Sequence, residues 1–322
     1  MTIQPDAPPL TVSAVTSVFN QEKTIGKAIE SVLALGDSIE EYIILDDAST
    51  DNTASIVAEY AQKHPIIKFL RNETNGGCIA GFRRLFFEAH ASYILVIPGD
   101  DFLLSTNMKA LIEFAKANPG MGLYFGDIII HSPEERRAIN TKFDLSKKPR
   151  TYSPDEIGPA IVGLSIPSAG MLVDKRLISD PKIYRNELQW FADWIGNMII
   201  ALRHGAGYAP GPTAVWNVYS TNFSAQGAQW KKQKEVLEKT LACLRSDEYR
   251  DIYRIMIKYK LFNCNAQGFY RLFTTDFRCW DRYTPRILKD CIFRMTRNYF
   301  AARLPPPMKD FFRTICPFIS KM

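Results

Sequence analysis

The chain has 322 residues, 46% of them hydrophobic and 23% charged, which predicts a globular protein with a substantial core. No window reaches about 18 uninterrupted apolar residues, and the N-terminus lacks the basic start and apolar run of a secretory signal, so we expect a cytoplasmic protein. The six cysteines contain no C-x-x-C pair, which argues against a zinc knuckle and a disulfide framework.

The net charge of +6 is unevenly distributed. Residues 1–230 hold 20 Lys and Arg against 25 Asp and Glu, whereas residues 231–322 hold 20 against 9. Such an asymmetry predicts a polyanionic neighbour for the second region, either a membrane surface or a nucleic acid. A solvated helical face is an equally weighted alternative.

The first part of the chain alternates strand and helix patterns. Apolar runs predict strands at 10–19, 41–47, 66–70, the start of 93–104, and 121–130. Periodic apolar residues predict helices over 25–33, after "ASTDNT" with Ile56, Val57 and Tyr60 on one face, up to about 90, over 107–119 and over 188–205. This rhythm predicts an α/β fold with a mostly parallel sheet and helices on both faces.

Other stretches lack this alternation. Residues 131–159 are polar and charged, and we interpret them as a long excursion or mobile loop. From about residue 229 the chain becomes basic, aromatic and helical in pattern. In its last predicted helix one face carries Leu288, Cys291 or Ile292, Met295 and Tyr299.

Two predicted strands end in paired aspartates, Asp46-Asp47 and Asp100-Asp101. Ligands of open α/β sheets bind beyond the carboxyl ends of the strands, so these four carboxylates are expected along one edge. Like charges held together are costly unless a cation or hydrogen-bond donors join them. A divalent ion and a donor-rich ligand would do both, whereas the alternative is that the aspartates cap helices or turns.

The segments "VSAVTSVFNQEKTIGKAIESVL", "IILDDASTDNTASIVAEYA", "IKFLRNETNGG" and "YILVIPGDD", in this order, resemble family 2 of the inverting, nucleotide-sugar-dependent glycosyltransferases. The resemblance covers roughly residues 10–225 and implies the GT-A fold. It divides the chain into a catalytic domain, 1–228, and a basic, aromatic-rich helical region, 229–322.

The resemblance implies that the nucleotide base is held by Ser17, Val18 and Asp47, with Asp46 close by. A carboxylate that accepts the imide N–H of uracil or thymine favours a UDP- or dTDP-sugar, because cytosine has no donor at that position. Arg83 is the expected contact of the diphosphate, although Phe82 stands at the aligned position and Arg84 is an alternative.

The pair Asp100-Asp101 resembles the family's D-x-D site, with Pro98 in place of the first acid. One carboxylate would contact ribose and the other Mg²⁺ or Mn²⁺, and the sequence leaves open which is the principal metal ligand. Where relatives have a histidine near the end of the catalytic domain, this chain offers Tyr219. The histidines match nothing and are expected at the surface: His64, His90, His131 and His204.

Asp193 in "WFADW" matches the acid that serves the family as catalytic base, although Ala192 replaces the usual preceding acid. The alternative is that Asp193 caps the following helix. "IPSAGMLVDKRL" resembles the acceptor side, which implicates Ser168, Ala169 and Gly170, and Gly170 could equally serve a turn.

The resemblance therefore implies transfer of a sugar to a saccharide or lipid-linked saccharide in the synthesis of bacterial cell-surface polysaccharide, such as O-antigen. The closing stretch would place Phe311, Phe312, Ile315 and Phe318 against an anionic bilayer, on the cytoplasmic face of the inner membrane. A packed helical subdomain or a homodimer contact is the alternative for that region. No recognition motif supports a nucleic-acid partner.

Two other functions remain as hypotheses. A nucleotidyltransferase would need a glycine-rich phosphate loop after the first strand, and "TSVFNQEK" has no glycine. A catalytically silent relative, which binds nucleotide sugar or acts as a scaffold, is suggested by Pro98, Ala192 and Phe82. Retention of the carboxylates argues for activity.

Overall fold

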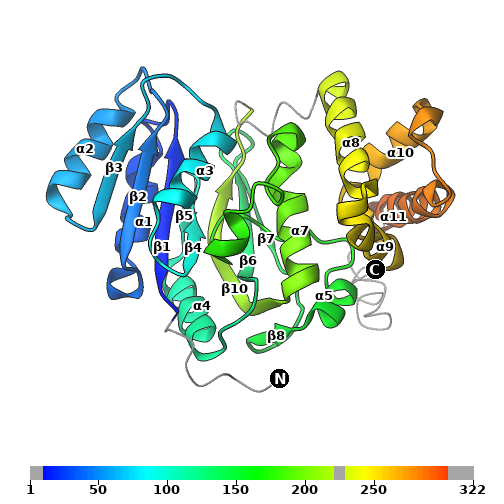
Figure 1. Ribbon diagram of the computed structural model, residues 1–322, viewed down its shortest axis with the longest axis horizontal. Helices are drawn as coiled ribbons and strands as arrows, with labels where there is room; N and C mark the ends of the chain where they lie inside the picture. The colour runs from blue at the N-terminus through cyan, green and yellow to red at the C-terminus, as the bar shows by residue number, and fades with distance from the viewer. Residues whose placement is uncertain (1–9, 221–228, 304–322) are drawn as a thin grey trace. The chain divides into compact units, whose positions relative to one another are not determined.

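The computed structural model of the chain describes residues 10–220 and 229–303 (Figure 1). The chain divides into two compact units. The first comprises Met1–Pro154, Ile166–Asn186 and Ala192–Asn222, and the second Asp155–Ser165, Glu187–Phe191 and Phe223–Met322. The boundary expected at residue 228 lies at the edge of residues that are not described, and it stays a prediction.

A ten-stranded sheet forms the first unit, in the order β3-β2-β1-β4-β9-β6-β10-β5, with β7 paired to β6 and β8 to β10. The strands are β1 Val12–Val18, β2 Glu41–Asp46, β3 Ile67–Arg71, β4 Tyr93–Val96, β5 Phe102–Leu103, β6 Leu123–Ser132, β7 Arg137–Thr141, β8 Arg150–Tyr152, β9 Met171–Asp174 and β10 Ala206–Asn217.

Strands β1 to β4 are parallel, which confirms the predicted alternation of strands and helices. Beyond β4 that alternation lapses, and β9, β7, β8 and β5 join the sheet in antiparallel pairs, which need no crossover helix. The parallel character is therefore confined to β1–β4 and the β6–β10 pair. Parallel strands bring the carboxyl ends of β1, β2 and β4 to one edge.

Helices cover both faces of this sheet, as predicted (Figure 1). Helices α1 (Ile25–Leu33) and α4 (Ser105–Ala117) share one apolar core with the side chains of Val12, Ala14 and Val18. Helix α3 (Cys78–Glu88) lies on β1 and β2, and α7 (Ala192–His204) contacts β6. The unit also contains α2 Thr53–Lys63, α6 Lys175–Ile178 and the 3-10 turn η1 Gly36–Ser38.

The expectation of a long loop over residues 131–159 is wrong. This stretch contains the end of β6, the strands β7 and β8, and the start of α5 (Pro154–Ala160). Strand β7 is exposed over most of its length and pairs with β6 as a hairpin, so it carries no buried alternation for the sequence to display.

The second unit is helical. Besides α5 without its first residue, its helices are α8 Trp230–Arg245, α9 Arg250–Lys258, α10 Ala266–Thr275 and α11 Thr284–Arg303, and these four are joined by the 3-10 turns η4 Asp247–Tyr249, η5 Leu261–Asn265 and η6 Phe277–Cys279. A further 3-10 segment, η2 Asn186–Phe191, precedes α7. In the core of the second unit Phe262 and Phe269 pack edge to face, with ring centroids 5.0 Å apart.

The predicted apolar face of α11 needs correction. Ile287 and Cys291 form its buried face, because they lie one turn apart, whereas Ile292 and Tyr299 are exposed. Among the described residues, no helix is both long and apolar enough to cross a bilayer. The four residues expected to face lipid, Phe311, Phe312, Ile315 and Phe318, lie outside the described residues.

Candidate active site

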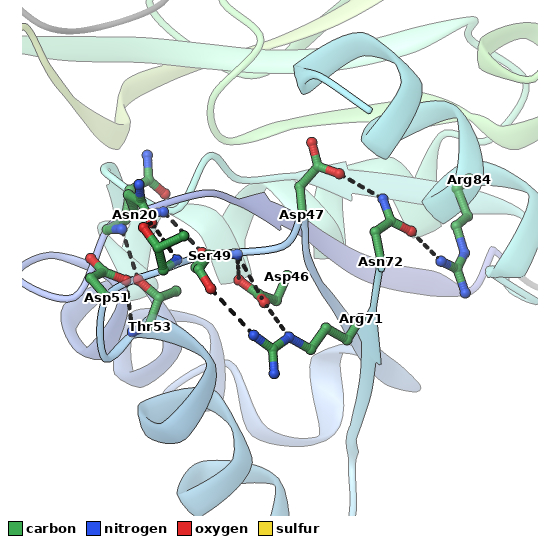
Figure 2. Close-up of polar contacts among 11 residues, drawn as sticks. Asn20, Asp46, Asp47, Ser49, Asp51, Thr53, Arg71, Asn72 and Arg84 are labelled. Atoms are coloured by element: carbon green, nitrogen blue, oxygen red, sulfur yellow. Dashed lines mark hydrogen bonds and ion pairs between the residues drawn. The ribbon is translucent and has the colours of Figure 1, made fainter. Parts of the chain in front are cut away.

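The loop after β1 and the loop after β2 are fastened together by side chains of the "DDASTDNT" segment (Figure 2). Ser49 Oγ accepts a hydrogen bond from the Asn20 backbone N–H at 2.9 Å. Thr53 Oγ1 accepts from the Gln21 N–H at 2.8 Å, and Asp51 Oδ2 from the Glu22 N–H at 3.1 Å. The polar residues of the motif therefore satisfy backbone donors of the neighbouring loop, which fixes the carboxyl edge of β1 and β2.

The nucleotide contact expected of Asp46 stays a prediction, and the structure gives this carboxylate other partners. Its side chain is 0% exposed and receives the Arg71 guanidinium, with Nε 3.0 Å from Oδ2. The Ser49 N–H also donates to this carboxylate at 3.3 Å, and Arg71 Nη2 donates to the Ser49 carbonyl at 3.2 Å (Figure 2). Asp46 is thus a paired, buried anion that holds the loop, and Arg71 is its partner.

Asp47 lies at the edge and is held by the turn before α3. Asn72 Nδ2 donates to its Oδ1 at 2.6 Å, the Gly76 N–H donates to the same oxygen at 2.9 Å, and the Gly77 N–H donates to Oδ2 at 2.8 Å. The residue is 2% exposed. Asp47 therefore explains the "NGG" turn, whose backbone amides surround a carboxylate.

The two β1 residues expected at the nucleotide base have different neighbours. Val18 is buried, and its carbonyl accepts from the Asp47 N–H at 2.8 Å. Ser17 is partly exposed and faces α3 at Gly81, where an added Cβ would come within 2.3 Å of Ser17 Oγ. Glycine is required at residue 81 for this close approach.

Of the two arginines near the "NGG" turn, Arg84 is connected to the site. Its Nη1 donates to Asn72 Oδ1, and Asn72 in turn donates to Asp47 (Figure 2). Arg83 is exposed on α3 and has no hydrogen bond or ion pair among the described residues. The diphosphate contact expected at Arg83 stays a prediction, and Arg84, the alternative, is the arginine that the structure links to Asp47.

Asp100 and Asp101 follow β4 at the same edge. Burial, and then the charge of Asp100, raise the pKa of Asp101 well above its ordinary value. Burial also raises the pKa of Asp100, which a hydrogen bond with Gln21 opposes. Asp101 Oδ1 accepts from the Asn217 N–H at 2.7 Å, and Asn217 Nδ2 donates to the Asp100 carbonyl at 2.6 Å.

Two further residues lie near this pair. His131 Nδ1 is 2.8 Å from Asn217 Oδ1, and the residue is partly exposed, so this histidine lies beside the residue that holds Asp101. Burial, followed by the charges of Asp100 and Asp101, raises the pKa of Tyr219. Tyr219 therefore lies within electrostatic reach of both carboxylates, where relatives were expected to place a histidine.

Asp193 lies in the first turn of α7 and belongs to the same cluster of charges. Desolvation, and then the negative charges of Asp193, Asp100 and Asp47, raise the pKa of the Cys78 thiol to about 12. A single thiol at the start of α3 thus lies within electrostatic reach of three of the predicted carboxylates. The structure brings these carboxylates together from the ends of the strands β2 and β4 and from the helix α7.

The carboxyl group of Asp193 is accessible yet surrounded by protein. Desolvation raises its pKa above the ordinary 3.8, while hydrogen bonds from Ser168 and the Trp194 N–H oppose this shift. The Trp194 N–H donates to Oδ1 at 2.7 Å. Asp193 lies inside the first turn of α7, so this contact is not that of an N-cap residue. Such a shift brings the pKa of a carboxylate closer to the neutral range in which a general base is most effective.

Ser168 Oγ donates to Asp193 Oδ2 at 3.0 Å, and behind it runs a chain of side chains. Asn197 Nδ2 donates to Ser168 Oγ and to the Ile166 carbonyl, both at 3.2 Å. Tyr184 OH donates to Asn197 Oδ1. Every donor in this chain points toward Asp193, so the chain stabilises the ionised carboxylate and fixes Ser168.

The other two residues expected on the acceptor side are structural. Ala169 is 6% exposed. Gly170 has a φ of +69°, and an added Cβ would come within 2.8 Å of the Ala214 Cβ. Gly170 therefore serves the turn into β9, which was the alternative for this residue. Ser168 remains as the polar group beside Asp193.

The carboxylates at this edge fit a divalent ion. The two adjacent acids raise each other's cost of ionisation, and a bound cation would remove that cost. Magnesium and manganese need no complete protein cage, because one or two carboxylates together with substrate phosphates and water suffice. Asp100 and Asp101 supply such a set, and the structure does not choose between them.

Sequence reasoning missed four of these residues: Arg71, Asn72, Tyr184 and Asn197. Asn197 had a usable signal, because an amide inside the apolar helix "WIGNMIIALRHG" must find hydrogen-bond partners once buried, and it is 0% exposed. The roles of Arg71 and Asn72 depend on the pairing of β2 with β3, which places Asp46 opposite Arg71.

The sequence profile of "Glycosyl transferase family 2" matches residues 13–175, half of the chain. The poly-beta-1,6-N-acetyl-D-glucosamine synthase of Staphylococcus epidermidis is 29% identical over 116 residues, 36% of this chain and 28% of that protein. This chain matches only about a third of the length of such curated relatives, 37% of one and 28% of another.

Two solved structures are similar over most of the chain. S. aureus TarS 1–349 in complex with UDP-GlcNAc has a TM-score of 0.65 at 16% identity, covering 95% of this chain and 92% of that one. The mannosyltransferase PcManGT from Pyrobaculum calidifontis, in complex with GDP-Man and Mn²⁺, has a TM-score of 0.56 at 14% identity, covering 97% and 83%. The GT-A fold is thereby confirmed, and the chain belongs to glycosyl transferase family 2.

Proposed function

We propose that the protein is an inverting glycosyltransferase that uses a UDP- or dTDP-sugar to extend a saccharide or lipid-linked saccharide in cell-surface polysaccharide synthesis. The observation that carries this proposal is the convergence of Asp47, Asp100 and Asp193 around the start of α3. Such a reaction needs at least one group at the nucleotide base, one at the diphosphate and one at the acceptor, and these would be Asp47, Asp100 and Asp193.

In the proposed reaction Asp193 takes the proton from the acceptor hydroxyl as that oxygen attacks the anomeric carbon. The nucleoside diphosphate leaves from the opposite face with the electron pair of the broken glycosidic bond, so the configuration inverts. Ser168 holds one carboxylate oxygen of Asp193 and the Trp194 N–H the other. Both hydrogen bonds orient the base before the acceptor arrives.

Asp100 and Asp101 would hold the divalent ion. When bound, such an ion neutralises the charge that develops on the departing diphosphate. Asn217 donates to Asp101 Oδ1 and fixes the direction of that carboxylate, while Asp47 and the backbone of the "NGG" turn define the base end of the donor site.

The relatives support this proposal. TarS was solved with UDP-GlcNAc, PcManGT with GDP-Man and Mn²⁺, and the staphylococcal relative is named as a polysaccharide synthase. We place the reaction on the cytoplasmic face of the membrane where lipid-linked acceptors are made. The basic C-terminal region would attach the protein to that membrane, or it would instead form a homodimer contact.

The proposal is tested by titrating the protein calorimetrically with UDP, dTDP, GDP and CDP, with and without Mn²⁺. We expect Mn²⁺-dependent binding of UDP or dTDP that is lost in Asp101→Asn and kept in Asp193→Asn. Mn²⁺-dependent binding without release of nucleotide from any donor sugar would favour the silent relative. Absence of nucleotide binding would overturn both.

A further inference from the structure

An open hollow of about 420 Å³ lies on the surface of the second, helical unit. Its lining contains four arginines, two tyrosines and one aspartate: Arg245, Arg250, Arg254, Arg282, Tyr253, Tyr283 and Asp281. We call this set the arginine pocket. Its volume is in the usual range of small-molecule sites, roughly 300 to 1,000 Å³.

The single carboxylate of the pocket is already used. Asp281 Oδ2 lies 3.0 Å from Arg245 Nε and accepts from Tyr253 OH at 2.7 Å. Asp281 Oδ1 accepts from the Tyr283 N–H and the Thr284 N–H, both at 2.9 Å, at the start of α11. This acid therefore positions Arg245 and the helix, and within the described residues Arg254 and Arg282 have no carboxylate partner.

The remaining arginines have donors to spare. Arg250 pairs with Asp247 at the open surface, and Arg282 Nη2 donates to Tyr283 OH at 2.8 Å. Arg254, one turn after Arg250 on α9, has no ion pair or hydrogen bond in the described part of the chain. Arg245 Nη2 is buried and likewise lacks a hydrogen-bond partner among the described residues.

A buried guanidinium nitrogen without an acceptor is costly, and it indicates a missing acceptor. Guanidinium groups match the geometry of phosphate oxygens with paired N–H donors, better than a lysine could. The excess of Lys and Arg over residues 231–322 adds attraction for an anion from the whole unit.

We propose that the arginine pocket binds the phosphate group of an anionic ligand, at a site separate from the donor residues of the first unit. The same chemistry is present in a phospholipid headgroup and in a free phosphorylated sugar. The pocket thus gives the basic region a specific anion, where the sequence predicted only a polyanionic neighbour.

The test uses the full chain and the double variant Arg254→Ser/Arg282→Ser. Arg286→Ser is the matched control, because Arg286 is an exposed arginine of α11 outside the pocket lining. Inorganic phosphate is titrated calorimetrically in EDTA, which removes metal-dependent binding at the donor site. We expect saturable binding in the wild type and the control, weakened at least about tenfold in the double variant.

Flotation with vesicles of phosphatidylglycerol and phosphatidylcholine, against pure phosphatidylcholine, separates the two sources of phosphate. Binding to the anionic vesicles that is lost only in the double variant supports a headgroup. Phosphate binding with no variant-dependent flotation supports a free phosphorylated molecule. Phosphate binding that is absent, or equal in all three proteins, overturns the proposal, whether or not nucleotide binding at the donor site succeeds.

Discussion

The hydroxyl of Ser168 donates a 3.0 Å hydrogen bond to Asp193, and it is the last link of a chain that begins at Tyr184. Two of the three links are made by Asn197, which is fully buried on α7, the helix that also carries Asp193. Asp193, the proposed base, and Asn197 therefore share one helix. This arrangement makes the orientation of Asp193 sensitive to residues that touch no substrate.

Replacing Ser168 with alanine should lower kcat and move the acidic limb of the pH profile to higher pH. The hydrogen bond from Ser168 lowers the pKa of Asp193 against the larger effect of desolvation, so its loss lets that pKa rise. We expect about a tenfold loss at neutral pH, with partial recovery at alkaline pH. Steady-state kinetics from acid to alkaline pH measures both.

Two controls accompany this variant. Ser168→Thr keeps the hydroxyl and should restore the position of the acidic limb, and Ser179→Ala, at an exposed serine after α6, should leave it unchanged. An acidic limb that does not move in Ser168→Ala would show that Asp193 is not the group titrating in the profile.

Asp193→Asn should abolish transfer while nucleotide binding stays within about twofold of wild type. Loss of a general base costs roughly 10² to 10⁴ in kcat, and asparagine keeps the shape of the side chain and its acceptor oxygen. Single-turnover measurement of sugar transfer, together with calorimetric binding of nucleotide, separates the two effects. Equal loss of binding and turnover would instead assign Asp193 to the donor site.

Asp101→Asn should reduce Mn²⁺-dependent nucleotide binding by about 10²-fold and stabilise the metal-free protein at neutral pH. Burial, and then Asp100, raise the pKa of Asp101 in the folded state above its ordinary 3.8, so the folded state binds this proton more tightly than the unfolded state. Wild-type stability therefore falls as pH rises from 3.8 through the raised pKa, and the variant escapes this loss.

The measurement is urea denaturation of both proteins in EDTA across this pH range. We expect the variant to be the more stable at neutral pH and the two to converge below pH 3.8. A constant difference at every pH would mean that the ionised pair carries no cost, and the electrostatic argument for a cation at Asp100 and Asp101 would fail.

The strands up to β4 and their helices were predictable because their apolar residues repeat at the spacing of two or of three and four, and the loops between them are short. The edge that carries the site followed from that topology. Which member of a pair points where did not: Asp46 and Asp47 are adjacent and alike in sequence, yet β3 places Arg71 opposite Asp46, while the "NGG" turn surrounds Asp47. Tertiary contacts also determine the β7 hairpin, the link of Arg84 rather than Arg83 to Asn72, and the hydrogen-bonded side chains behind Ser168. A local sequence pattern does not record such contacts.

Arg71→Met should destabilise the fold by about 2 kcal/mol, because it leaves the buried carboxylate of Asp46 with only the weak Ser49 amide contacts at 3.3 Å. Methionine retains the apolar stem of the arginine and removes its charge together with the Nη2 donor to the Ser49 carbonyl. The free energy of unfolding is measured by urea denaturation at neutral pH. Lys68→Met is the control, because Lys68 on the same strand pairs with Glu88, whose side chain is more exposed than that of Asp46. This substitution should cost under about 1 kcal/mol. Equal losses of unfolding free energy in the two variants would show that the unpaired Asp46 carboxylate carries no extra cost. Asp46 would then be free for the nucleotide contact that the sequence predicted.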